Sequence, residues 1–206
     1  MGHHIYTIGR EFGSGGYSVA KLLSEKLGVK LYDKELLAQA AKDSGFCQEI
    51  LENHDEKPTS SFLYSLVMDT YSGGSFSTAP FLGMPLNHKV FLAQFDTIKK
   101  IAEEEPCVIV GRCADYALAN NKDCLNIFVH ASLEDRIKRV SQRNDLTENK
   151  ARDLIQKMDK QRSSYYNYYT CKKWGDARSY DLCLNTSKQS PEKCVEIILE
   201  YRKNMQ

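Results

Sequence analysis

The chain has 206 residues, which is enough for one enzyme-sized domain with a substantial hydrophobic core. Its 28 lysines and arginines against 27 aspartates and glutamates leave a formal net charge of +1. This balance excludes a global electrostatic field that would draw the protein to nucleic acid or to an anionic membrane. Any anion-binding site must therefore be local.

The seven cysteines are spread along the chain and form neither a disulfide framework nor a zinc motif. Free cysteines of this kind are typical of a reducing compartment. The first strand-like run begins already at Ile5, and no apolar run approaches the roughly 20 residues that span a bilayer. We therefore expect a cytoplasmic protein without nucleic-acid or membrane partners.

The first predicted elements are a strand, a glycine-rich turn and a helix. Residues 5–8 are a β-branched and aromatic run that ends at a glycine, as a buried parallel strand does. Apolar residues over 19–27 recur at helical spacing until Gly28 ends the pattern. Such a turn aims unpaired backbone N–H groups and the positive end of a helix dipole at one point, which favours a bound phosphate.

The turn is similar to a phosphate-binding loop that lacks its lysine. In the standard motif G-x-x-x-x-G-K-[ST] the lysine reaches the terminal phosphates and the hydroxyl holds magnesium. Here Arg10 stands at the first glycine, Gly16 at the lysine and Tyr17 at the hydroxyl position, which leaves Ser18 as the candidate magnesium ligand. A structural turn without a ligand is the alternative. The candidate phosphate-binding residues are Gly13, Ser14, Gly15, Gly16, Tyr17 and Ser18.

Four more strands are predicted, over 29–33, 107–110, 125–131 and 180–184, and helices separate them. Continuous apolar strands that alternate with helices indicate a parallel sheet covered on both faces. We therefore predict an α/β fold with three layers, α/β/α, around a mostly parallel five-stranded sheet. Ligands bind at the carboxyl ends of such strands. In this chain those ends carry the glycine-rich turn, Asp33, Gly111-Arg112 and Ser132.

Two segments interrupt the alternation within the single domain predicted over 1–206. Residues 45–87 hold Gly73-Gly74, three of the five prolines and a possible helix around 62–70, and they are predicted to form an inserted lobe. Residues 144–175 contain a helix with Thr147 as its N-cap, followed by an aromatic run. We predict a lid here, with the tyrosines either packing the lid or stacking on a base.

Arginines recur along the helices before and within this lid. Ser132 is the expected N-cap of the first helix, and Arg136, Arg139 and Arg143 share one of its faces. A solvated basic face is the alternative to a phosphate-binding role. In the lid, Asp159 lies three residues before Arg162 and is predicted to orient it. Arginines of this kind stabilise the charge of a phosphoryl group in transfer.

Taken together, the chain resembles the cytidylate kinase-like proteins, relatives of the nucleoside monophosphate kinases within the P-loop NTPase fold. The order and spacing of its motifs carry the resemblance over nearly the whole length. These motifs are the glycine-rich turn with 18–21, Leu31-Tyr32-Asp33, Val110-Gly111-Arg112, residues 132–139, 159–162, Tyr180-Asp181-Leu182 and Asn185-Thr186-Ser187.

The resemblance implies residue roles, cofactors and partners. It implies that Asp33 holds the acceptor nucleotide and that Arg112 contacts the acceptor phosphate, with a helix N-cap and a structural ion pair as their alternatives. It also implies that the lobe at 45–87 binds the acceptor, and that ATP and Mg²⁺ are the cofactors. The arginines that the resemblance places around the transferred phosphoryl are Arg136, Arg139 and Arg162.

The missing lysine leaves three hypotheses open. In the first, the protein is an ATP- and Mg²⁺-dependent phosphotransferase acting on a nucleoside monophosphate or another small acceptor, with Arg10 or another arginine in place of the lysine. Lys21 is a poor substitute, because family members have a lysine there as well as in the loop. In the second, the fold binds nucleotide or anion without catalysis. In the third, the aromatic stretch 164–174 binds a protein partner. The sequence gives no indication of the oligomeric state.

Overall fold

The computed structural model describes residues 4–57 and 84–205, so the helix predicted around 62–70 lies outside the described residues. Within those ranges the sheet has five strands in the order β2-β3-β1-β4-β5, and every pairing is parallel. This confirms the predicted sheet. The strands are β1 (Ile5–Arg10), β2 (Lys30–Tyr32), β3 (Cys107–Val110), β4 (Cys124–His130) and β5 (Leu182–Asn185).

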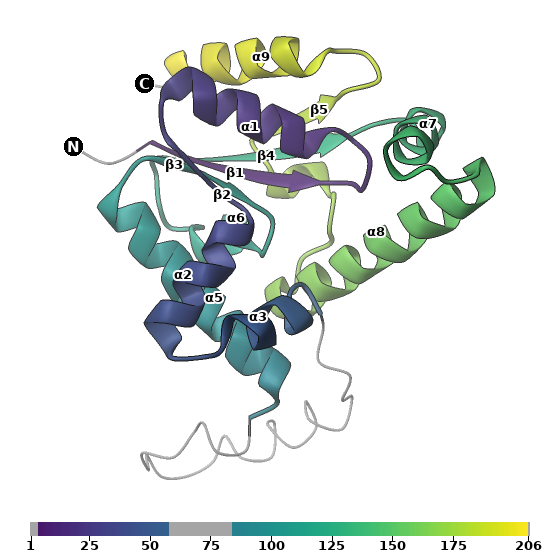
Figure 1. Cartoon of the computed structure of the whole chain (residues 1–206). Helices are drawn as coiled ribbons and strands as arrows, with labels where there is room; N and C mark the ends of the chain where they lie inside the picture. Colours follow the sequence, from purple (N-terminus) through teal and green to yellow (C-terminus); the bar gives the residue numbers. More distant parts are fainter. Residues whose placement is uncertain (1–3, 58–83, 206) are drawn as a thin grey trace.

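Helices cover both faces of the sheet, as predicted (Figure 1). One face is covered by α1 (Gly16–Leu27) and α9 (Pro191–Lys203). The other is covered by α2 (Lys34–Ser44), α5 (Leu86–Glu104) and the short α6 (Ala114–Ala117). Successive strand residues point to opposite faces. The continuous apolar runs in the sequence are therefore the signature of a sheet that is buried on both sides.

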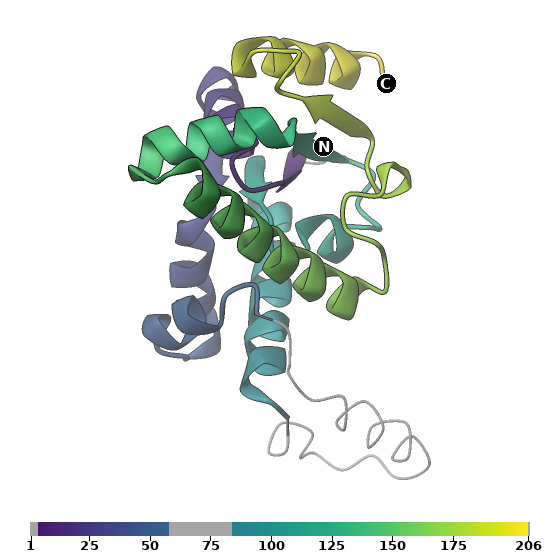
Figure 2. The ribbon, with the colours of Figure 1, turned by 90° about the vertical axis from the view of Figure 1, so that its right-hand side faces the viewer.

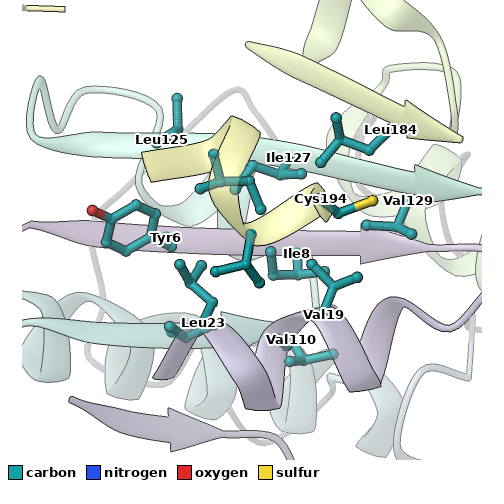
Figure 3. Close-up of a cluster of buried hydrophobic side chains, with 14 residues drawn as sticks. Tyr6, Ile8, Val19, Leu23, Val110, Leu125, Ile127, Val129, Leu184 and Cys194 are labelled. Atoms are coloured by element: carbon teal, nitrogen blue, oxygen red, sulfur yellow. The ribbon is translucent and has the colours of Figure 1, made fainter. Parts of the chain in front are cut away.

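The core between the sheet, α1 and α9 fixes the start of α1. Val19 and Leu23 of α1 are fully buried and pack in one cluster with Ile8 of β1 and with Ile198 of α9 (Figure 3). Burying a side chain of this size stabilises the fold by roughly 1.5–3 kcal/mol. The turn between β1 and α1 is thus held at both ends by core residues.

Two helices, α7 (Leu133–Asn144) and α8 (Glu148–Thr170), lie on the side of the molecule toward which the strands point (Figures 1 and 2). The predicted N-caps are confirmed: the Ser132 hydroxyl accepts from the Asp135 amide at 3.2 Å, and the Thr147 hydroxyl accepts from the Lys150 amide at 3.4 Å. The remaining elements are α3 (Gln48–His54) and a 3₁₀ turn (Ala177–Ser179). Among the described helices, none has the combination of length and apolar character that crossing a membrane requires.

Candidate functional site

Polar side chains that follow three neighbouring strands meet at one edge of the sheet. Arg10 is the last residue of β1, Asp33 directly follows β2, and Arg112 comes two residues after β3. The Asp33 carboxylate lies 3.1 Å from Arg112 Nη1 and 3.8 Å from Arg10 Nη2. The structure therefore brings together the residues that the sequence placed at the strand ends. Asp33 also stands at the N-cap position of α2, but its side chain makes no capping hydrogen bond there.

Arg112 is a buried ion-pair residue whose donors are almost fully used. Its Nε and Nη2 donate to the Asp55 carboxylate at 3.0 and 2.8 Å, and its Nη1 donates to Asp33 and to the Val110 carbonyl at 3.1 and 3.2 Å. These bonds to described residues use four of the five N–H groups of its guanidinium. Burial opposes its charge, but the surrounding carboxylates outweigh burial and raise its pKa. These contacts match the ion-pair alternative for Arg112.

Glu56 occupies the centre of the cluster, although the sequence did not indicate it. Its carboxylate accepts a hydrogen bond from the Arg112 amide at 3.2 Å, and lies 3.6 Å from Arg10 Nη1 and 3.5 Å from Arg162 Nε. Burial would raise the pKa of Glu56, but the three arginines outweigh it and lower the pKa to about 2. Its only signal in the sequence is an adjacent acid, Asp55, within the segment assigned to the inserted lobe.

Arg10 reaches from the glycine-rich turn to this cluster. A Cβ atom placed on Gly16 would lie 2.6 Å from the Arg10 Cβ and 3.2 Å from its Cγ, so the stem of Arg10 crosses the position of the usual lysine. The guanidinium lies beyond, at 3.6 Å from Glu56 and 3.8 Å from Asp33. Its side chain is 13% exposed, yet it donates no hydrogen bond to any described residue.

The glycine-rich turn has the geometry of an anion-binding loop. Gly15 is the N-cap of α1 in the left-handed conformation, at φ 79°, which a residue with a side chain rarely adopts. The Val19 amide makes the first bond of the helix, to the Gly15 carbonyl at 3.1 Å. The amides of residues 16–18 therefore precede the bonding pattern of the helix, which leaves donors at the positive end of its dipole.

The arginines of α7 hold this turn in place. Arg139 donates to the carbonyl oxygens of Ser14 and Thr186 at 3.2 and 2.8 Å, and to the Thr186 hydroxyl at 2.9 Å. Arg136 is buried and pairs with Asp159 at 2.5 Å. The solvated-face alternative therefore does not describe these two arginines. Arg143, farther along α7, is exposed and lies over the Phe12 ring, 5.3 Å from its centroid.

Asp159 makes its hydrogen bonds to the turn and to α7, and it acts on Arg162 only through its charge, which raises the pKa of Arg162. Its predicted role in orienting Arg162 stays a prediction. Besides Arg136, the Asp159 carboxylate accepts from the Phe12 amide at 2.8 Å. The i, i+3 spacing on α8 suggested a contact with Arg162, but α7 and the turn approach Asp159 more closely. Thr186 also supports the turn, a role that the sequence did not indicate. Its hydroxyl donates to the Ser14 carbonyl at 2.6 Å.

Arg162 of α8 completes the cluster. Its Nη1 donates to the Arg10 carbonyl at 3.3 Å, whereas its Nε is buried and has no hydrogen-bond partner among the described residues. Burial and the neighbouring Arg10 lower its pKa to about 10. A cavity of about 20 Å³ adjoins Arg10, Glu56, Arg112 and Arg162, enough for about one water molecule.

The tyrosines of α8 pack the helix against the domain. The Tyr165 hydroxyl donates to Gln94 at 3.1 Å, the Tyr166 hydroxyl donates to Asp115 at 2.6 Å, and Tyr169 stacks on Phe91 at 4.0 Å between ring centroids. All three tyrosines are buried. These contacts agree with the interpretation that the tyrosines pack the lid segment and do not stack on a base. Tyr168 is 40% exposed.

Ser18 fits a magnesium site in which the metal arrives with a phosphate ligand. Its side chain is exposed on the first turn of α1 and makes no hydrogen bond in the described ranges. Over 4–57 and 84–205, no group of three His, Cys, Asp or Glu side chains gathers as a metal cage. Mg²⁺ often takes only one or two protein ligands together with substrate phosphates and water, so a single hydroxyl is a suitable donor.

The parallel sheet with a glycine-rich turn between its first strand and helix defines the class of P-loop kinases. Shikimate kinase from Bacteroides thetaiotaomicron has this fold, with a TM-score of 0.52 at 13% identity over 97% of this chain and 98% of that one. A gluconokinase from Sinorhizobium meliloti gives a TM-score of 0.51 at 13% identity, over 97% and 91% of the two chains. An uncharacterized protein from Eubacterium ventriosum is more similar, with a TM-score of 0.73 at 32% identity over 98% and 99%.

Within this class, the chain belongs to the cytidylate kinase-like family, whose profile matches residues 5–188. The cytidylate kinase of Sulfolobus acidocaldarius is 29% identical over 199 residues, covering 94% of this chain and 92% of that protein. The cytidylate kinase of Pyrococcus horikoshii is 27% identical over 196 residues, with coverages of 94% and 85%. The predicted family is therefore confirmed, and the relatives and the fold support a kinase.

Proposed function

We propose that this protein transfers the γ-phosphoryl group of ATP to a nucleoside monophosphate or a similar small phosphorylated acceptor. The observation that carries this proposal is the position of Arg10. Its guanidinium, which pairs with Asp33 and Glu56 but donates no hydrogen bond to a described residue, lies between the anion-binding turn and the strand-end cluster. A phosphoryl group in transfer needs a cation at such a place, between donor and acceptor.

The donor phosphates belong at the turn. The amides of residues 17 and 18 and the α1 dipole bind the β- and γ-phosphates, joined by the Gly16 amide, which otherwise donates to the Ser14 hydroxyl at 3.4 Å. Arg10 takes the charge-neutralising role of the missing lysine. Arg136 and Arg139 act through the turn, because their donors already hold the Phe12 and Ser14 carbonyl groups and Asp159. They are therefore proposed as positioning residues.

The acceptor belongs at the ends of β2 and β3. Asp33 contacts the acceptor nucleotide, and Arg162 binds its phosphate through the Nε that has no partner among the described residues. Arg112 holds Asp33 and Asp55 in place and keeps one N–H group for the ligand. The segments 45–87 and 144–175 are proposed as the acceptor-binding lobe and the lid.

The reaction is an in-line displacement at the γ-phosphorus. An oxygen of the acceptor phosphate forms the new bond while the bond to the β,γ-bridging oxygen breaks, and ADP leaves with that electron pair. The acceptor oxygen is already ionised, so no protein base is needed. Magnesium, held by Ser18 and the phosphates, supplies charge neutralisation when bound. Arg10 and Arg162 stabilise the charge on the transferred group from the protein side.

Turnover with magnesium ATP and a panel of nucleoside monophosphates tests the proposal. We expect ADP formation with at least one acceptor, a loss of about 10²-fold or more in kcat for Arg10→Gln, and little change for Lys21→Gln. Lys21 is a suitable control, because its side chain is 59% exposed and pairs only with Glu25, at 3.9 Å. An Arg10→Gln enzyme with unchanged kcat would remove Arg10 from the mechanism.

A non-catalytic nucleotide-binding protein is the second candidate, and the pairing of the arginines with three carboxylates favours it. Its test is thermal unfolding in the presence of ATP. A raised Tm without turnover of any acceptor supports this candidate, because a ligand that binds only the folded state stabilises it. If no nucleotide raises the Tm or turns over, both candidates fail and the aromatic stretch 164–174 becomes the surface to examine for a partner.

A further inference from the structure

The cluster at the ends of β1, β2 and β3 is electrically balanced without any ligand. Three guanidinium groups face three carboxylates at distances of 2.8–3.8 Å. An entering phosphate adds up to two negative charges beside those carboxylates, and like charges repel strongly in a partly buried site. Phosphate therefore binds here more tightly when a carboxylate moves out of the cluster. The six residues are Arg10, Arg112, Arg162, Asp33, Asp55 and Glu56.

Glu56 is the carboxylate of the cluster that accepts no hydrogen bond from a described arginine side chain. Asp55 accepts two guanidinium hydrogen bonds from Arg112, at 2.8 and 3.0 Å, and a third from Gln94 at 3.2 Å. Asp33 accepts one from Arg112 at 3.1 Å. Among the described residues, Glu56 accepts a hydrogen bond only from the Arg112 amide, and its guanidinium neighbours stay at 3.5 and 3.6 Å without a hydrogen bond.

The donors around Glu56 exceed what a carboxylate can satisfy. The Arg10 guanidinium donates to no described residue, and the Arg162 Nε is buried without a described partner. A phosphate group has more oxygens than a carboxylate and forms shorter bonds to guanidinium groups, typically about 2.7–2.9 Å. The backbone of Glu56 has φ 49°, a strained value for a residue with a side chain that is common at ligand clamps.

We propose that Glu56 is an internal stand-in for a substrate phosphate: it neutralises Arg10 and Arg162 in the unliganded protein, and a phosphate monoester displaces it. Gly111 permits this arrangement, since a Cβ at that position would lie 2.6 Å from Glu56 Oε1. The inference rests on the proposed function only in taking these arginines as a phosphate site. Glu56 thus sets how tightly the site holds its ligand.

Binding of inorganic phosphate to the full chain tests the inference. Wild type, Glu56→Gln and the control Glu196→Gln are compared by calorimetry and thermal unfolding, in phosphate and in chloride of equal ionic strength. Glu196 is a suitable control because its pair with Lys193 is exposed on α9. We expect Glu56→Gln to have a lower Tm in chloride but to bind phosphate at least about tenfold more tightly, since no carboxylate competes. Equal affinity in all three proteins would overturn the inference.

A double variant shows whether the additional phosphate affinity of Glu56→Gln arises at the arginine cluster. The site vacated by Glu56 includes the Arg162 guanidinium, so Glu56→Gln combined with Arg162→Gln should lose the extra affinity. A gain in phosphate affinity that persists in the double variant overturns the inference. If Glu56→Gln is unfolded in both salts, Glu56→Asp replaces it in the test, because it retains the charge on a shorter side chain. Tighter phosphate binding by Glu56→Asp supports the inference, and unchanged binding rejects it. The gain without kinase turnover leaves this inference standing while the proposed function fails. Kinase turnover without tighter phosphate binding by Glu56→Gln supports the proposed function and overturns this inference.

Discussion

The side chain of Arg10 occupies the space that a side chain at Gly16 would need, because the two Cβ positions would lie only 2.6 Å apart. In the standard phosphate-binding loop these two positions hold a glycine and a lysine. Here the glycine and the basic residue have exchanged places between the end of β1 and the start of α1. The two departures from the motif are therefore one structural change, and neither position can be restored independently of the other.

We expect Gly16→Lys alone to be destabilised and not to improve kinase activity. Forcing a Cβ against Arg10 overpacks a buried site, which costs about 1–3 kcal/mol in the free energy of unfolding. Urea unfolding of Gly16→Lys measures this loss. Ala38→Lys is the control, because residue 38 is an exposed helical position on α2. If Gly16→Lys is as stable as this control, a side chain at position 16 does not clash with Arg10.

The double variant Arg10→Gly with Gly16→Lys should recover most of that stability. Removing the Arg10 side chain opens the space that the stem of the introduced lysine would fill, so the two substitutions are expected to be non-additive by at least roughly 1 kcal/mol. A double-mutant cycle in urea measures the coupling, and turnover with magnesium ATP shows whether the restored motif supports transfer. Strictly additive losses would mean that the two positions are independent.

Removal of Arg112 is expected to destabilise the protein far more than removal of Arg10. Arg112→Gln leaves Asp55 and Asp33 without their main cation in a buried site, a change that costs about 3–5 kcal/mol. Arg10 donates no hydrogen bond to a described residue, so Arg10→Gln should cost roughly 1 kcal/mol. Urea unfolding of both variants gives the comparison. Similar losses would show that Arg10 is a structural residue as well.

The alternation of strands and helices could be predicted because a sheet that is buried on both faces leaves continuous apolar runs, as at 107–110. The meeting of Arg10, Asp33 and Arg112 followed from the same topology, since the carboxyl ends of parallel strands share one edge. Glu56 could not be found in this way. It follows a short helix that is not part of the sheet layers, and its position depends on tertiary packing alone.

Side-chain pairing was harder to predict than position. Asp159 and Arg162 have ideal spacing for a contact along one helix, yet Asp159 turns to Arg136 and to the Phe12 amide. A buried amide and a buried guanidinium both require partners, and this tertiary demand outweighs a contact along the surface of one helix. Sequence spacing therefore identified the right residue on the right helix but did not indicate its hydrogen-bond partners.

Asp159→Asn should weaken ATP binding more than it slows transfer. The substitution removes the charge that pairs with Arg136 and weakens the bond to the Phe12 amide, so the turn loses its support from α8. We expect a rise in KM for ATP of roughly tenfold, corresponding to about 1.4 kcal/mol, with a smaller change in kcat. Steady-state kinetics measure both constants. Asp153→Asn, an exposed position on the same helix, is the control, and an equal effect there would rule out the specific role.

The stability of the cluster should depend on acid pH through Glu56. The three arginines lower its pKa from 4.5 to about 2 in the folded protein, against the opposing effect of burial. Below pH ~4.5 the unfolded chain therefore binds a proton at this position while the folded chain does not, and the stability due to Glu56 is lost as the pH falls toward about 2.

Wild type should accordingly lose up to about 3 kcal/mol relative to Glu56→Gln over this range in phosphate-free buffer, since one pKa unit corresponds to about 1.4 kcal/mol. Asp55, whose pKa is raised by burial and by the charge of Glu56, contributes with the opposite sign, so the difference between the two proteins reports on the Glu56 charge together with its effect on Asp55. Urea unfolding at several pH values between about 5 and 2.5 measures it. A difference that stays constant with pH would mean that Glu56 is not held as a charged partner of the arginines.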